Sequence, residues 1–178
     1  MLAFPVLLVL TLGSMVLQMF LPPLSGAGGG ATAMVFPGFL FFGAVAFPYP
    51  AALLLAGATG LAWDLLTAQF VDGAFEIRPG TSMLIYGLLA TVMHGFRPLY
   101  LRGRWLVHWL LCGLFTSAAV LVEFLLLGYH RQSFAPFTPE IWVRIAAPGV
   151  LAVALAPPVF FALAPLVPRR ISGLDLGT

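Results

Sequence analysis

Residues 105–128 read WLVHWLLCGLFTSAAVLVEFLLLG, and this stretch decides the fold class of the chain. It contains one acid, Glu123, and no Lys or Arg. At 1.5 Å per residue, a helix of this length rises about 36 Å, enough to cross the roughly 30 Å hydrocarbon core of a bilayer. A transmembrane β-strand would instead show about ten residues of alternating polarity. The stretch therefore predicts a transmembrane α-helix.

The composition of the whole chain agrees with this interpretation. Of 178 residues, 61% are apolar and 8% are charged, whereas a soluble domain has roughly 45–50% and 25%. So little charge cannot cover the surface of a soluble domain, which predicts that lipid surrounds most of the chain. The eight basic residues are all Arg and lie dispersed, mostly in short connections. This is typical of membrane topology signals, and no nucleic-acid partner is expected.

Five further apolar segments extend the prediction to an all-α membrane protein, a bundle of about six transmembrane helices. The expected helices cover residues 2–21, 33–47, 51–70, 80–96, 105–128 and 141–167. They form a single domain, 1–170, followed by a short tail, 171–178. Polar loops are expected at 71–79, 97–104 and 129–140, a tight turn at Pro48-Tyr49-Pro50, and kinks in the last helix at Pro148, Pro157 and Pro158.

The basic residues also predict an orientation. With the N-terminus inside, Arg97, Arg102, Arg104, Arg169 and Arg170 face the cytoplasm, and Arg78, Arg131 and Arg144 face outward. The excess inside places both termini in the cytoplasm. A cleaved signal peptide is the alternative interpretation of residues 1–21. A retained first helix is favoured because this segment has no basic start and its apolar run is too long.

Ionisable groups inside a membrane are costly and therefore informative. Asp64 and Glu123 both fall roughly 7–9 Å from the outer ends of their expected helices, counted at 1.5 Å per residue. Tyr86 falls at about the same depth, and Arg144 lies slightly nearer the surface. We therefore expect Asp64, Tyr86, Glu123 and Arg144 to form a polar layer in the outer leaflet.

Small residues share helix faces with these acids. The spacing of Gly57, Gly60, Asp64 and Thr67 places them on one face, and Gly113, Thr116, Val120 and Glu123 form a comparable stripe. Small residues allow close helix–helix approach, so Gly57, Gly60, Gly80 and Gly113 are predicted helix-packing positions. The acids should therefore point away from lipid. They could form internal structure with Arg144, bind the helix of a partner, or serve transport or catalysis.

Other chemistry is not indicated. His94, His108, His130 and Cys112 show no metal-ligand spacing, so no metal or cofactor is expected, and Cys112 is interpreted as a packing residue. The chain carries no nucleophile-elbow, phosphate-loop or zinc-protease motif. A membrane aspartyl protease needs two intramembrane Asp, and only Asp64 qualifies. The sequence predicts a protein that is not an enzyme.

The stretch from Phe36 to Leu127 resembles the rod shape-determining protein MreD family. The likeness rests on a short Pro-led helix at Phe36-Pro37-Gly38, a Gly-x-x-Gly-x-x-x-Asp-Leu helix at residues 57–65, Gly80 with Tyr86 in the next helix, and Glu123 in the fifth. The link at residues 69–79 is longer than the usual one in that family. The N-terminus also lacks the basic residues that are often present there.

The resemblance implies a non-enzymatic, multi-pass scaffold of the bacterial inner (cytoplasmic) membrane that serves the cell-elongation machinery (elongasome), peptidoglycan synthesis and cell shape. Implied partners are MreC first, then MreB, RodA and a class B penicillin-binding protein. The alternative is a substrate-binding subunit of an energy-coupling-factor vitamin transporter, a family of similar six-helix fold. A featureless Gly-rich first loop and a first helix without an Ala-rich docking motif count against that alternative.

Overall fold

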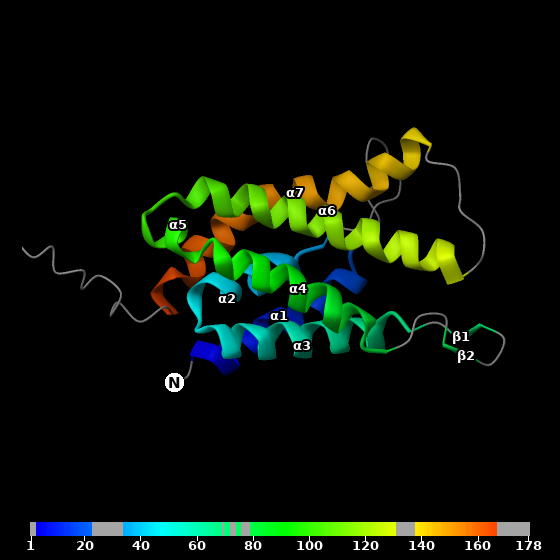
Figure 1. Ribbon diagram of the computed structural model, residues 1–178, viewed down its shortest axis with the longest axis horizontal. Helices are drawn as coiled ribbons and strands as arrows, with labels where there is room; N and C mark the ends of the chain where they lie inside the picture. The colour runs from blue at the N-terminus through cyan, green and yellow to red at the C-terminus, as the bar shows by residue number, and fades with distance from the viewer. Residues whose placement is uncertain are drawn as a thin grey trace, which may run out of the picture.

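The computed structural model describes residues 3–22, 34–68, 70–71, 74–75, 79–130 and 138–166 (Figure 1). Within these ranges the fold is all-helical apart from one pair of two-residue strands. The elements are α1 (Ala3–Met19), α2 (Phe36–Ala46), α3 (Tyr49–Leu66), β1 (Phe70–Val71), β2 (Ala74–Phe75), α4 (Thr81–Gly95), α5 (Arg97–Leu101), α6 (Trp105–His130), α7 (Pro139–Leu163) and the 3-10 turn η2 (Ala164–Leu166).

Three of the described helices, α3, α6 and α7, are long and apolar enough to cross a membrane by length and composition. The apolar helices α1, α2 and α4 are shorter, at 17, 11 and 15 residues. This confirms the prediction of an all-helical protein with apolar helices of membrane-spanning length. The expected total of six spans stays a prediction.

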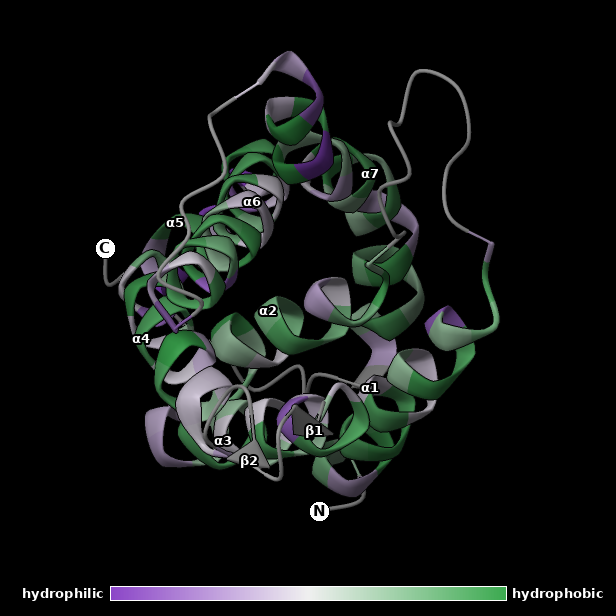
Figure 2. Cartoon of the chain, turned by 90° about the vertical axis from the view of Figure 1, so that its right-hand side faces the viewer, coloured by the Kyte–Doolittle hydropathy of each residue, from purple (hydrophilic) through white to green (hydrophobic). Residues whose placement is uncertain are grey.

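The short helix α2 lies at the centre of the bundle. Figure 2 shows the other helices arranged around it, and α2 contacts each of them, α1 and α3 through α7. Phe36, Leu40, Phe41, Phe42 and Val45 are each at most 1% exposed. Ten of the eleven residues of α2 are buried, so this helix forms the core of the protein.

The most extensive contacts join α3 to α4 and α6 to α7. Apart from the short α5, successive helices run in opposite directions. One end of the bundle, which we call the α5 end, therefore holds the start of α6 and the last turns of α4 and α7. The opposite end holds the start of α4, the end of α6 and the start of α7. Figure 1 shows α5 at one end and the β1–β2 pair at the other.

Some boundaries differ from the sequence-based expectation. α3 begins at Tyr49, because Pro50 occupies its first turn, where proline is favoured, instead of forming a turn before it. It ends at Leu66, and Phe70, expected inside that helix, pairs with Phe75 in a small antiparallel hairpin. The expected loop at 97–104 contains α5, which has Pro98 in its first turn. The last helix ends at Leu163, and the expected tail, 171–178, lies outside the described residues.

Candidate functional site

Asp64 caps the start of the neighbouring helix α4. Its Oδ2 accepts hydrogen bonds from the backbone N–H groups of Gly80, at 2.6 Å, and of Ser82, at 3.1 Å. Its Oδ1 lies 3.3 Å from the same Ser82 nitrogen. The first N–H groups of a helix have no partner within the helix and attract negative charge. Asp64, which is 8% exposed, therefore satisfies the start of α4 from another helix.

Glu123 joins three helices. Its Oε1 accepts a hydrogen bond from the indole Nε1 of Trp63 on α3, at 3.0 Å, and one from the hydroxyl of Tyr86 on α4, at 3.4 Å. The carboxyl group itself comes from α6, so one oxygen atom links α3, α4 and α6. Two of the four residues of the predicted polar layer, Tyr86 and Glu123, thus meet directly.

Aromatic rings close the space beneath this contact. The ring of Phe36, the first residue of α2, lies 5.2 Å from that of Trp63 and 5.4 Å edge-to-face from that of Tyr86. Phe36 and Tyr86 are almost fully buried, at 0% and 1% exposure. Trp63 and Tyr86, the two donors of the hydrogen bonds to Glu123, therefore pack against the same buried ring, and this contact helps to fix their positions.

Arg144 lies in α7 near the same end of the bundle, with an exposed side chain. Its predicted pairing with an acid of the polar layer stays a prediction.

Trp63 was not singled out from the sequence, although it directly precedes Asp64. A Trp in an apolar helix carries an N–H donor that needs an acceptor when buried, and this signal points to a nearby acid.

The glycines act in two ways. A Cβ atom on Gly60 would collide with the backbone of α4 at Met83 and lie 2.6 Å from the Ser82 carbonyl carbon, so α3 and α4 meet backbone to backbone there. A Cβ on Gly57 would meet only the flexible Met83 side chain, at 3.3 Å. Gly80, which the sequence places among the helix-packing glycines, has no atom within 4 Å of such a Cβ. It serves instead as the turn residue before α4, with φ at +100°.

A second backbone contact joins α6 to α7. A Cβ on Gly113 would lie 2.6 Å from the carbonyl oxygen of Gly149, and one on Gly149 would lie 2.6 Å from that of Gly113. The sequence points to Gly113 but not to Gly149, because Pro148 beside it suggests a kink instead. The signal that could have identified Gly149 is that small residues pair across closely packed helices, so Gly113 calls for a small residue on the neighbouring helix.

The histidines and the cysteine serve the packing of the helices. Nδ1 of His94 lies 2.7 Å from the Ala44 carbonyl oxygen, and Nε2 of His108 lies 3.1 Å from that of Phe96. His130 contacts the Leu126 carbonyl of its own helix, and Cys112 is fully buried. In the described part of the chain, no three His, Cys, Asp or Glu side chains come together in a way that could hold a metal ion.

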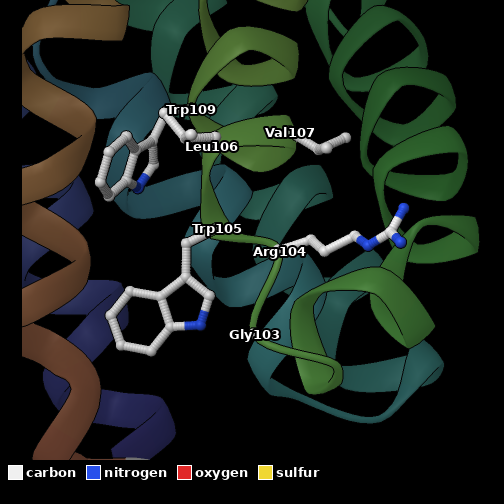
Figure 3. A pocket seen from close by; sticks show the side chains of 6 residues that line it. All are labelled: Gly103, Arg104, Trp105, Leu106, Val107 and Trp109. Atoms are coloured by element: carbon white, nitrogen blue, oxygen red, sulfur yellow. The ribbon is translucent and has the colours of Figure 1, made fainter.

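A depression of about 460 Å³ surrounds the first turns of α6 at the α5 end. Its lining residues are Gly103, Arg104, Trp105, Leu106, Val107 and Trp109. Figure 3 shows the indoles of Trp105 and Trp109 on one flank, toward α7, and Arg104 extending the opposite way. Nearby, burial raises the pKa of Tyr100 above its ordinary value, so its hydroxyl is neutral at physiological pH.

The two acids thus differ in what they can do. Both oxygens of Asp64 face backbone N–H groups of α4, whereas Glu123 holds two side-chain donors with one oxygen. Both arrangements hold helices together.

Comparison of the chain with protein-family models, with curated proteins and with solved structures finds no match in any of the three.

Proposed function

We propose that this chain is a non-enzymatic scaffold of the bacterial cell-elongation machinery. In this proposal it crosses the inner membrane six times, with both termini in the cytoplasm, as in the MreD family that it resembles. Its partners are MreC first, then MreB, RodA and a class B penicillin-binding protein. The bundle fixes the position of these partners by presenting helix faces to them.

The observation that carries the proposal is the bonding of Asp64. This residue ends the motif on which the resemblance rests, and both of its oxygens accept hydrogen bonds from the start of α4. A carboxylate used in this way fastens two helices together. A fixed α3–α4 pair is what a scaffold requires, because a face that docks a partner must hold its shape.

The outer faces of this end supply the docking positions. Large apolar side chains near the polar residues point outward, with exposures of 38% to 76%: Leu61, Leu65, Leu84, Leu88, Val122 and Leu125. In a membrane such side chains contact either lipid or the apolar helix of a partner. We assign part of this surface to the transmembrane helix of MreC.

Site-specific photocrosslinking in the native membrane tests this assignment. A photoreactive residue at Leu65 or Leu84 should crosslink to MreC, because both side chains are more than 60% exposed beside Asp64. The matched control is Leu106, which is 67% exposed but lies at the α5 end. Its crosslinks should go to lipid or to other partners.

Absence of MreC from every crosslinked product at this end would contradict the proposal. Binding of a water-soluble vitamin by the purified chain, together with no MreC crosslink, would instead favour a substrate-binding subunit of an energy-coupling-factor transporter.

A further inference from the structure

Charge is distributed unequally between the two ends of the bundle. Three arginines lie within eight residues at the α5 end: Arg97 at the start of α5, and Arg102 and Arg104 in the turn before α6. The acids of the described ranges, Asp64, Glu123 and Glu140, all lie toward the opposite end. The α5 end is therefore strongly positive.

These arginines are not neutralised by the described part of the chain. The guanidinium groups of Arg102 and Arg104 are exposed, and within the described ranges neither makes a hydrogen bond or an ion pair with another side chain. The Nε of Arg97 is buried and has no hydrogen-bond partner there. The positive charge of this end is therefore available to an anion from outside.

The start of α6 adds to this positive potential. The depression at residues 103–107 lies directly over the first turn of this 26-residue helix, and that first turn contains no acid. The first N–H groups of a helix attract anions, above all phosphate. One of the three arginines, Arg104, lines the depression together with this helix start, and Arg102 lies two residues before it in the same turn.

An apolar surface continues from this depression along α6. Leu106, Leu110 and Leu114 follow one another at four-residue intervals, so they lie on one face of the helix, and each is more than 60% exposed. Trp105 lies at the start of the helix, the position that Trp commonly occupies at a membrane interface. A cationic depression that opens onto such a stripe matches a molecule with an anionic head and an apolar tail.

We propose that the α5 end is a binding site for an anionic phospholipid. The phosphate lies over the first turn of α6, where Arg102 and Arg104 reach it, and the acyl chains lie along Leu106, Leu110 and Leu114. A free phosphate ion would use the cationic part but would gain nothing from the leucine stripe. This inference does not depend on the proposed scaffold function.

Lipid binding by the purified full-length chain tests the site. The protein in uncharged detergent is titrated with phosphatidylglycerol or phosphatidylcholine, and bound lipid is counted by native mass spectrometry. Each arginine near a membrane surface contributes about a fivefold gain in affinity for anionic lipid. Arg102→Ala with Arg104→Ala should therefore weaken phosphatidylglycerol binding roughly 25-fold and leave phosphatidylcholine binding unchanged.

Two further variants separate charge from damage to the fold. Arg102→Lys with Arg104→Lys keeps both charges and should retain most of the binding. Glu140→Gln changes the net charge by one at the opposite end, at an exposed position, and should bind phosphatidylglycerol as the wild type does. If the double alanine variant does not fold, Arg104→Gln alone carries the test with an expected loss of about fivefold.

Three results would overturn the proposal. The first is equal binding of the two lipids by the wild type. The second is a change in phosphatidylglycerol binding in Glu140→Gln as large as the change in the double alanine variant. The third is complete displacement of the lipid by millimolar inorganic phosphate, which would make the depression a site for a free anion.

Discussion

The indole nitrogen of Trp63 donates a hydrogen bond to Oε1 of Glu123 across 3.0 Å, and thereby connects α3 with α6. The backbones of these two helices do not pack extensively against each other. The hydrogen bond thus adds to the packing of α4 against α6 in joining the α3–α4 pair to the α6–α7 pair.

We expect a double-mutant cycle on Trp63 and Glu123 to show coupling. Trp63→Phe removes the donor, and Glu123→Ala removes the acceptor of Trp63 and Tyr86. Interhelical hydrogen bonds in membrane proteins contribute about 0.6 kcal/mol on average and up to about 1.7. We expect both single variants and the double variant to lower the free energy of unfolding in detergent. The loss in the double variant should be smaller than the sum of the two single losses, and the difference should equal about that coupling energy.

The same measurement tests two roles of Glu123: as hydrogen-bond acceptor of Trp63 and as ion-pair partner of Arg144. Glu123→Gln keeps an acceptor for the indole and should be milder than Glu123→Ala. The sequence also predicts a pair with Arg144, so a cycle on Glu123 and Arg144 should show its own coupling. Simple additivity in the Trp63 cycle would contradict the role assigned to the hydrogen bond.

Asp64→Ala should destabilise the protein, because it leaves N–H groups of Gly80 and Ser82 without an acceptor. Loss of a helix cap costs about 0.5–2 kcal/mol. Asp64→Asn keeps one acceptor oxygen and should lose less. Glu140→Ala, which removes an exposed acid from the first turn of α7, is the control and should change the free energy of unfolding by less than about 0.5 kcal/mol. Equal losses at the two acids would be the contrary result.

Gly60→Ala should separate α3 from α4, because the added methyl group meets the backbone at Ser82 and Met83. Overpacking of this kind costs about 1–3 kcal/mol. The matched control is Gly87→Ala, since a Cβ there has no atom within 4 Å and α4 gains about 0.8–1 kcal/mol of helix propensity. Thermal unfolding in detergent should shift in opposite directions for the two variants.

Gly149→Ala should act in the same way on the α6–α7 pair. The new methyl group would meet the carbonyl oxygen of Gly113 and the side chain of Ser117. The expected loss is again about 1–3 kcal/mol, measured as the free energy of unfolding. Gly13→Ala in α1, where a Cβ has no atom within 4 Å, is the control. A neutral result at Gly149 would show that the two helices can slide apart without cost.

The helices were predictable to the extent that apolar runs mark them. The segment beginning at Trp105 starts where the sequence places it and ends two residues later than expected, at His130. The two ends of α3 were harder. Pro50 can open a helix as readily as it forms a turn, and the residues after Leu66 remain apolar although the backbone has turned toward the hairpin. α5 was missed because a five-residue segment that begins with Arg97 and Pro98 is typical of a loop.

The polar site shows a different limit. The depths of Tyr86 and Glu123 follow from counting residues along helices, and the structure brings these two side chains together. The bonds of Asp64 to α4 could not be found this way, since they depend on how the chain returns after residues 70–75. Gly149 was missed for a related reason: its importance depends on which residue of α6 lies opposite.

The length of α2 has a consequence for how the protein is made. Its 11 residues rise about 16 Å, roughly half the hydrocarbon thickness of a bilayer. Such a segment is too short to be inserted as an independent span. It must enter as a hairpin with α3, which follows after two residues. Its packing against α7 also means that a nascent chain still lacking residues 139–163 leaves aromatic rings of the core, such as Phe42, uncovered. The core around α2 is therefore closed only when α7 has joined the bundle.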